Sequence, residues 1–222
     1  MSVDISVGER SGLEQLAKAS RLLYKKGFVE GSEGNCSLRV GDMVFIKVTE
    51  AVSRTIRVTD FVGVDLATGN IQGQVKSKPS IELHLHLETY RRRDDVKAII
   101  HSHPRCTRVV SKFVDSLPMF EHSRGIPEVK VVEGEAGSPE LAKAAASEFQ
   151  RGAVAVILRG HGLVTVGKTL GEAFDLIGSV ERAASEWLEF LLVGGLSTPL
   201  GKRQQPLVTH VPRSKAAAKP RR

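Results

Sequence analysis

Apolar positions recur along the chain with the helical period in some stretches and with the strand period in others. Four helical stretches are bounded by residues that start or end helices, such as serine, proline and glycine. They predict a helix that begins near Leu13 and stops at Gly27, and helices over residues 81–93, 138–150 and 169–192. Short apolar or alternating runs predict strands at 36–40, 43–48, 61–66, 96–101, 129–133, 153–159 and 163–166.

The order of these elements indicates the fold class. The first two strands are joined by a Gly41-Asp42 turn and form a hairpin, whereas helices separate most of the later strands. The run at 153–159 is continuously apolar, as in a strand that is covered on both faces. We therefore expect an α/β fold in which helices cover a mixed sheet.

Length and charge limit the classes of function. A chain of 222 residues with 41% hydrophobic residues fits one domain, which we expect over residues 1–200. Residues 201–222 carry seven lysines and arginines and no acid, so they account for the whole net charge of +7. We expect them to form a basic, solvated tail. The rest of the chain is formally neutral, so nucleic acid is not an expected partner.

Other patterns are absent from the sequence. No apolar run approaches the roughly 18 residues of a membrane span, and residues 1–12 do not have the pattern of a signal peptide. Two cysteines, Cys36 and Cys106, do not suggest a disulfide framework, so we expect a cytoplasmic protein that does not bind membranes. Neither a GxGxxG nor a P-loop motif is present.

Three histidines lie where predicted strands end. His101 and His103 are two residues apart at the end of a strand, so both imidazoles face the same side. His161 follows the buried strand and is flanked by glycines, which allow a tight bend and a close approach. Three histidines and a carboxylate suit zinc or a similar divalent ion with one position open for substrate. Glu82, at the start of a helix, is the best candidate for the carboxylate.

Four motifs in one order make the chain resemble the class II aldolase/adducin family. They cover residues 30–39 (EGSEGNCSLR), 78–82 (KPSIE), 101–104 (HSHP) and 159–170 (RGHGLVTVGKTL). The resemblance extends over about residues 10 to 193. It implies a three-layer α/β/α domain with a mixed, largely antiparallel sheet. It also implies a homotetramer with active sites between neighbouring subunits.

The resemblance also implies roles for individual residues. His101, His103 and His161 would hold Zn²⁺, and Glu82 would act as acid and base and could also ligate the ion. The ion would coordinate the oxygens of a ketose-like substrate and stabilise the enediolate that forms when a carbon–carbon bond breaks. The residues implied to bind the substrate's phosphate are Ser32, Gly34, Asn35, Lys47 and Ser80.

The sequence departs from the family pattern at three places. Ile81 stands where a second hydroxyl is usual, and Lys47 stands in the second phosphate loop, where it resembles the lysine of the epimerases. His122 occupies the position of the tyrosine that the aldolases use, and it can still donate or accept a proton.

These observations predict a zinc-dependent lyase of the aldolase type that cleaves a small hydroxylated keto compound, such as a ketose 1-phosphate. A pentulose-phosphate 4-epimerase and a metal-dependent decarboxylase are alternatives on the same site. An adducin-like interaction protein without catalytic function is the alternative from another class, and bound metal would distinguish it from the enzymes.

Overall fold

A computed structural model of the protein describes residues 7–72, 77–119 and 128–196. Its strands form one sheet in the order β3-β2-β1-β4-β8-β7-β6-β5, in which only the β6–β7 pair is parallel. This confirms the expected mixed, largely antiparallel sheet. The strands are β1 (Asn35–Val40), β2 (Met43–Lys47), β3 (Phe61–Asp65), β4 (Ala98–Ser102), β5 (Ser116–Pro118), β6 (Glu128–Val132), β7 (Ala155–Leu158) and β8 (Gly162–Gly167).

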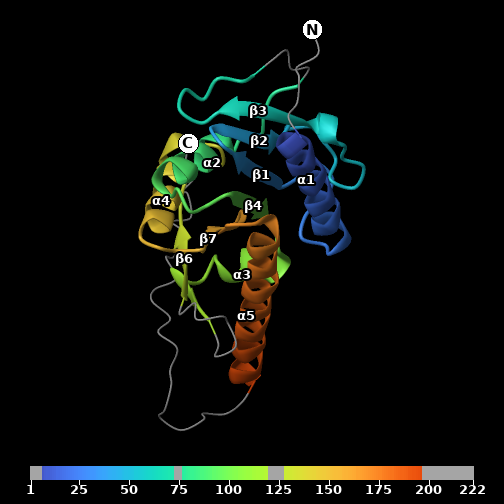
Figure 1. Ribbon diagram of the computed structural model, residues 1–222. Coiled ribbons are helices and arrows are strands. Elements are labelled where there is room, and N and C mark those ends of the chain that lie inside the picture. Colours follow the sequence, from blue (N-terminus) through green and yellow to red (C-terminus); the bar gives the residue numbers. More distant parts are fainter. Residues whose placement is uncertain (1–6, 73–76, 120–127, 197–222) are drawn as a thin grey trace, which may run out of the picture.

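Helices cover both faces of this sheet and complete the expected three layers (Figure 1). Helices α2 and α4 pack on one face with the apolar side chains of one buried cluster, while α1, α3 and α5 pack on the other. The helices are α1 (Val7–Lys25), α2 (Leu83–Arg92), α3 (Arg105–Val110), α4 (Pro139–Gln150) and α5 (Leu170–Leu196), with a 3-10 turn η1 (Val58–Asp60). Successive strand residues alternate between the two apolar clusters, as the strand period requires.

Local signals set the ends of several elements as predicted. Gly41 has a φ of +60° in the β1–β2 hairpin turn, a conformation that glycine adopts without a steric penalty. Ser138 caps α4, because its side chain accepts a hydrogen bond from the Leu141 amide and Pro139 occupies the first helical position. Helix α2 begins at Leu83, two residues later than predicted. The Leu83 amide donates to the Ser80 carbonyl, so a turn precedes the helix.

Sequence reasoning missed the short elements α3, β5 and η1. The Cys106 and Thr107 amides at the start of α3 donate to the Glu181 carboxylate of α5, at 2.8 and 2.9 Å. The Thr107 hydroxyl donates to the same carboxylate at 2.7 Å. Because Pro104 makes no side-chain cap for this helix, a residue far along the chain caps it instead. Helix α3 is thereby attached to α5 next to the end of β4.

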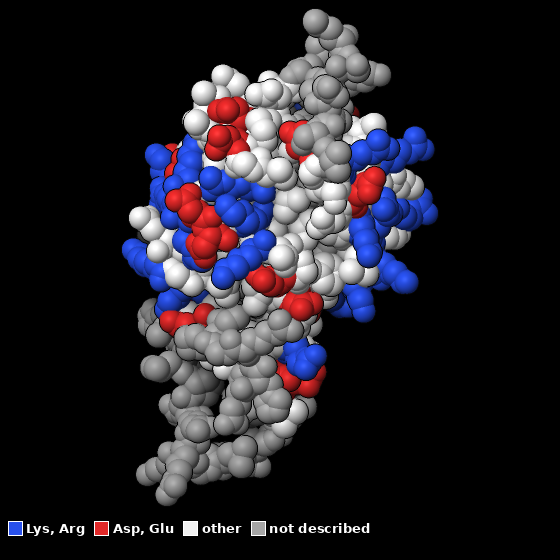
Figure 2. All heavy atoms as spheres, viewed as in Figure 1, with Lys and Arg blue, Asp and Glu red and all other residues white. Residues whose placement is uncertain are grey.

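The remaining expectations concern surface charge, membrane spans and the basic tail. On the face shown in Figure 2, basic and acidic side chains are intermixed over α2 and α4. In the described part of the chain, no helix is both long and apolar enough to cross a bilayer. The basic tail, residues 201–222, lies outside the described residues, so its solvated character stays a prediction.

Candidate metal centre and active site

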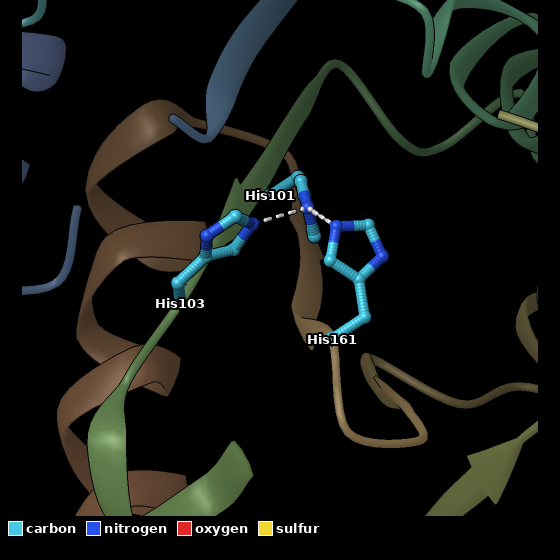
Figure 3. Close-up of side chains that lie close together, drawn as sticks. All are labelled: His101, His103 and His161. Carbon is cyan, nitrogen blue, oxygen red and sulfur yellow. Dashed lines mark hydrogen bonds between the residues drawn. The ribbon is translucent and has the colours of Figure 1, made fainter. Parts of the chain in front are cut away.

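The three candidate histidines converge at one end of the sheet (Figure 3). His101 is the penultimate residue of β4, His103 follows the end of that strand, and His161 lies in the turn between β7 and β8. The Nε2 atom of His101 lies 3.0 Å from that of His103 and 3.4 Å from that of His161. Among the described residues, these three form the group of side chains placed to hold a metal ion.

Hydrogen bonds fix the tautomers of two of these rings. His101 Nδ1 lies 3.3 Å from the Leu163 carbonyl and His103 Nδ1 lies 3.0 Å from Glu33 Oε2, and both of these oxygens can only accept. Each Nδ1 therefore carries the proton and each Nε2 presents a lone pair. Two lone pairs 3.0 Å apart repel unless a cation lies between them. The site is thus arranged for a cation.

Burial keeps the imidazoles neutral. It lowers the pKa of His101 well below the usual value, and the neighbouring histidines lower it further. Burial also lowers the pKa of His161 to about 4, with smaller contributions from the charges of His103 and Arg108. The pKa of His103 is lowered by burial too, although the hydrogen bond to Glu33 opposes this change. Neutral rings are the form that ligates metals.

The triad also matches the size of a zinc ion. Two imidazole nitrogens bound tetrahedrally at about 2.0–2.1 Å from one zinc ion lie about 3.3 Å apart, close to the two distances from His101, and the ligand atoms of all three histidines lie within 4.8 Å of one another. Three histidines leave a fourth position for substrate, as in catalytic zinc sites. The residues present therefore fit a zinc ion or a similar divalent ion.

Two glycines around His161 have different functions. Gly160 has a φ of +66°, which bends the chain after β7. At Gly162, a Cβ atom would collide with the Ser102 carbonyl oxygen and lie 2.8 Å from the His101 ring. The expected tight bend is thus at Gly160. Gly162 instead allows β8 to begin directly against the histidine pair.

Glu82 is linked to the triad through β1 without belonging to its group of ligand atoms. Asn35 on β1 pairs with His101 on β4. The side-chain amide of Asn35 donates to Ser80 Oγ, and this oxygen also accepts a hydrogen bond from the backbone amide of Glu82. The side chain of Glu82 is 3% exposed, and neither carboxylate oxygen has a close hydrogen-bond partner among the described residues. Burial raises the pKa of Glu82 to about 7, and the Gly137 amide acts in the opposite direction.

The residues that we expect to bind the substrate's phosphate lie next to the contacts that join Asn35, Ser80 and Glu82. Gly34 has a φ of +61°, and a Cβ there would lie 2.8 Å from the His101 carbonyl, so the loop lies directly against β4. The Lys47 ammonium is buried and donates to the Ser32 carbonyl at 2.5 Å and to the Glu33 carbonyl at 3.4 Å. Burial lowers the pKa of Lys47 to about 8. One buried acceptor, Asn35 Oδ1, has no partner in the described part of the chain.

A buried network behind the site was not identified from the sequence. Tyr90 donates to the Lys97 carbonyl at 3.3 Å, so its oxygen accepts from Ser37, and Ser37 in turn accepts from His86 Nδ1. The direction of this chain leaves His86 Nε2 as an acceptor. That atom is fully buried and has no partner among the described residues. His86 lies four residues after Glu82, and its backbone amide donates to the Glu82 carbonyl at 3.3 Å.

Glu33 contacts the histidine triad, and His122 is the remaining residue with an expected role. Sequence reasoning assigned no role to Glu33, although its position in the first motif was a usable signal. A carboxylate that orients a metal-binding histidine is a common partner in such sites. His122 lies outside the described residues, so its proton-transfer role stays a prediction.

Comparisons with known proteins identify the family of this chain. The model of the class II aldolase and adducin N-terminal domain matches residues 14–188. The L-fuculose phosphate aldolase of Methanocaldococcus jannaschii is 33% identical over 81% of this chain and 97% of its own length. A 5-methylthioribulose-1-phosphate/5-deoxyribulose-1-phosphate aldolase of Rhodospirillum rubrum is 28% identical over 84% of this chain and 85% of its own. The L-fuculose-1-phosphate aldolase structure from Thermus thermophilus has a TM-score of 0.75 and 25% identity, covering 86% of this chain and all of that one.

The chain belongs to the class II aldolase and adducin family. The family and these relatives confirm the expectation of an aldolase-type lyase for sugar phosphates. These two relatives are named for different sugar phosphates, so membership of the family does not by itself identify the substrate.

Proposed function

We propose that the protein is a zinc-dependent lyase that cleaves the C3–C4 bond of a ketose 1-phosphate. The observation that carries this proposal is the convergence of three neutral imidazoles, which Asn35 and Ser80 link to Glu82, a buried carboxyl group whose pKa is raised to about 7. An acid with a pKa near the working pH is suited to both giving and taking a proton.

Each part of the site would have one function in this reaction. His101, His103 and His161 would hold the ion, which would stabilise the negative charge that develops on the substrate's oxygens. Glu82 would give the proton that C3 gains when the bond breaks, and its buried position excludes water from that transfer. Its carboxylate lies outside the group of ligand atoms, which favours acid and base chemistry over ligation.

The substrate's phosphate would bind at the loop next to β4. Ser80 retains a hydroxyl proton to donate, because its oxygen accepts from both Asn35 and Glu82. The backbone of Ser32 to Gly34 and the Lys47 ammonium would supply further positive groups. His122, in place of the tyrosine, would take the proton from the C4 hydroxyl group as that carbon becomes the carbonyl carbon of the aldehyde product.

A homotetramer and a cytoplasmic location form part of the same proposal. Large apolar side chains are exposed in one chain, among them Ile81 at 60%, Phe113 at 50% and Leu192 at 67%, which supports burial by other subunits. Both cysteines are free thiols, as is usual in a reducing compartment.

The test is incubation of the zinc-loaded protein with L-fuculose 1-phosphate and 5-deoxyribulose 1-phosphate, followed by identification of the products. We expect dihydroxyacetone phosphate and an aldehyde, which together preserve all the carbon atoms of the substrate. An isomeric pentulose phosphate formed from ribulose 5-phosphate would favour the epimerase. Carbon dioxide released from a keto acid would favour the decarboxylase. The complete histidine set argues against a purely structural, adducin-like role.

A further inference from the structure

A pocket of about 310 Å³ adjoins the histidine triad and has His103 in its wall. One side is the segment after α1, with Glu30 and Glu33, and the other is α3 with the turn that follows it. Gly160, next to His161, also lines this pocket. Glu82, Asn35 and Ser80 do not line it, so it adjoins, on the Glu33 side, the loop proposed to bind phosphate and does not include the Asn35–Ser80 part of that site.

Three cations lie on the α3 side of this pocket. Arg105, Arg108 and Lys112 are spaced three and four residues apart, which places them along the same side of the helix and its extension. All three are exposed, and their side chains have neither an ion pair nor a hydrogen bond within the described residues. By contrast, Arg93 and Arg159 each bind a carboxylate.

Without a bound anion, these cations would weaken metal binding at the histidine triad. Arg108 lines the same pocket as His103 and as Gly160, the neighbour of His161, so its guanidinium lies on the side of the metal ligands. A permanent cation there repels a divalent ion. A negatively charged group between Arg108 and the ion would be attracted to both of them and would offset this repulsion. Of the two acids in the pocket, Glu33 is already bonded to His103.

We propose that Arg105, Arg108 and Lys112 form a subsite for a carboxylate of the substrate beside the metal. Three cations and two glutamates leave the pocket with a small positive excess, which suits a singly charged carboxylate better than a phosphate dianion. Guanidinium groups bind carboxylates in a bidentate manner. The inference rests on the proposed function and narrows its substrate to a sugar acid, phosphorylated at the end that the Asn35–Ser80 loop binds.

The test compares two metal-binding probes on the zinc-loaded full-length protein. Glycolate and malate share an α-hydroxycarboxylate that chelates zinc, and malate carries one more carboxylate. We expect calorimetry to show that malate binds at least about tenfold more tightly, as one charge-assisted hydrogen bond would give. The Arg108→Gln variant should bind both probes nearly equally. Arg151→Gln, a matched change at the opposite end of β7, should retain the preference.

Two outcomes would overturn the proposed carboxylate subsite. Equal binding of both probes to the wild-type protein would do so, as would a malate preference that survives both Arg108→Gln and Lys112→Gln. A third probe, 3-phosphoglycerate, keeps the α-hydroxycarboxylate and carries a phosphate in place of the second carboxylate of malate, so it tests the class of anion. A gain over glycolate that exceeds the malate gain and is lost in Arg108→Gln would assign the subsite to phosphate. Failure to bind zinc would overturn the proposed function itself, whereas zinc binding without a malate preference would overturn the subsite alone.

Discussion

At the scale of single residues, Glu33 determines how His103 presents its Nε2 atom. Its carboxylate accepts the Nδ1 proton at 3.0 Å, so the ring is held in one tautomer and orientation. We expect Glu33→Ala to weaken zinc binding by about 10–100-fold. The zinc affinity of Glu33→Gln should lie between those of the wild type and Glu33→Ala, because an amide oxygen still accepts the hydrogen bond but carries no charge. Competition with a chelator of known affinity measures this. Glu30→Ala in the same loop is the control and should bind zinc as the wild type does.

Glu82, the proposed acid and base, lowers the stability of the folded protein at neutral pH. Its pKa of about 7 in the folded protein lies above its ordinary value of 4.5, so its favourable contribution is present below pH 4.5 and is lost as the pH rises through 7. In the metal-free protein, Glu82→Gln should therefore become more stable relative to wild type between pH 5 and pH 8. The expected gain is roughly 3 kcal/mol from the size of the shift. Urea denaturation at both pH values measures it.

The same substitution should abolish most of the activity. With the proton carrier removed, we expect kcat to fall by about 10²–10⁴-fold while the zinc content stays near the wild-type value. Because Glu82 gives a proton in the cleavage direction, wild-type kcat for cleavage should fall as the pH rises through about 7, where the carboxyl group loses that proton. Turnover by Glu82→Gln at the wild-type rate would show that another group moves the proton.

At the scale of elements, the turn between β7 and β8 brings His161 to the pair on β4. A Cβ at position 162 would collide with the Ser102 carbonyl and lie 2.8 Å from the His101 ring. We expect Gly162→Ala to lower both the free energy of unfolding, by about 1–3 kcal/mol, and the zinc affinity. Gly178→Ala is the matched control, because nothing lies within 4 Å of a Cβ there. In the interior of α5 it should stabilise the protein by about 0.5–1 kcal/mol.

Helix α3 depends on a contact from α5. The Glu181 carboxylate accepts three hydrogen bonds at the start of α3, from Cys106 and Thr107. Glu181→Ala should destabilise the protein by about 1–2 kcal/mol in urea denaturation, as the loss of a helix cap does. The exposed Glu186→Ala, on the same helix, should change stability by less than about 0.5 kcal/mol. Equal effects of the two variants would contradict this account of α3.

The same contact explains why some elements could not be predicted. The long periodic helices and the hairpin follow from local signals, as Gly41 and Ser138 show. Helix α3 has six residues and is capped by a residue 74 positions away, and β5 has three residues, so neither has a readable local pattern. The ligand histidines were predictable from spacing and glycine flanks. The position of Glu33 in the first motif was a signal for a role, but its contact with His103 depends on strand register, and the contact of His86 with Ser37 depends on helix packing.

At the scale of the whole molecule, one sheet brings the ligands together from distant parts of the sequence. Strands β1, β4 and β8 are neighbours, so Asn35, His101 and the turn that holds His161 meet at one end. The apolar residues exposed around this unit support the proposed tetramer. Light scattering of the purified protein should give about four times the chain mass of 24.1 kDa. A monomer that turns over substrate would contradict the proposed assembly.

The central claim is that this protein is a metal enzyme whose ion is held by three histidines. Elemental analysis of the purified protein, beside a His103→Ala variant, tests it most directly. We predict about one zinc ion per chain in the wild-type protein and little or none in the variant. No stoichiometric divalent metal in the wild-type protein, even after incubation with zinc, would contradict the account.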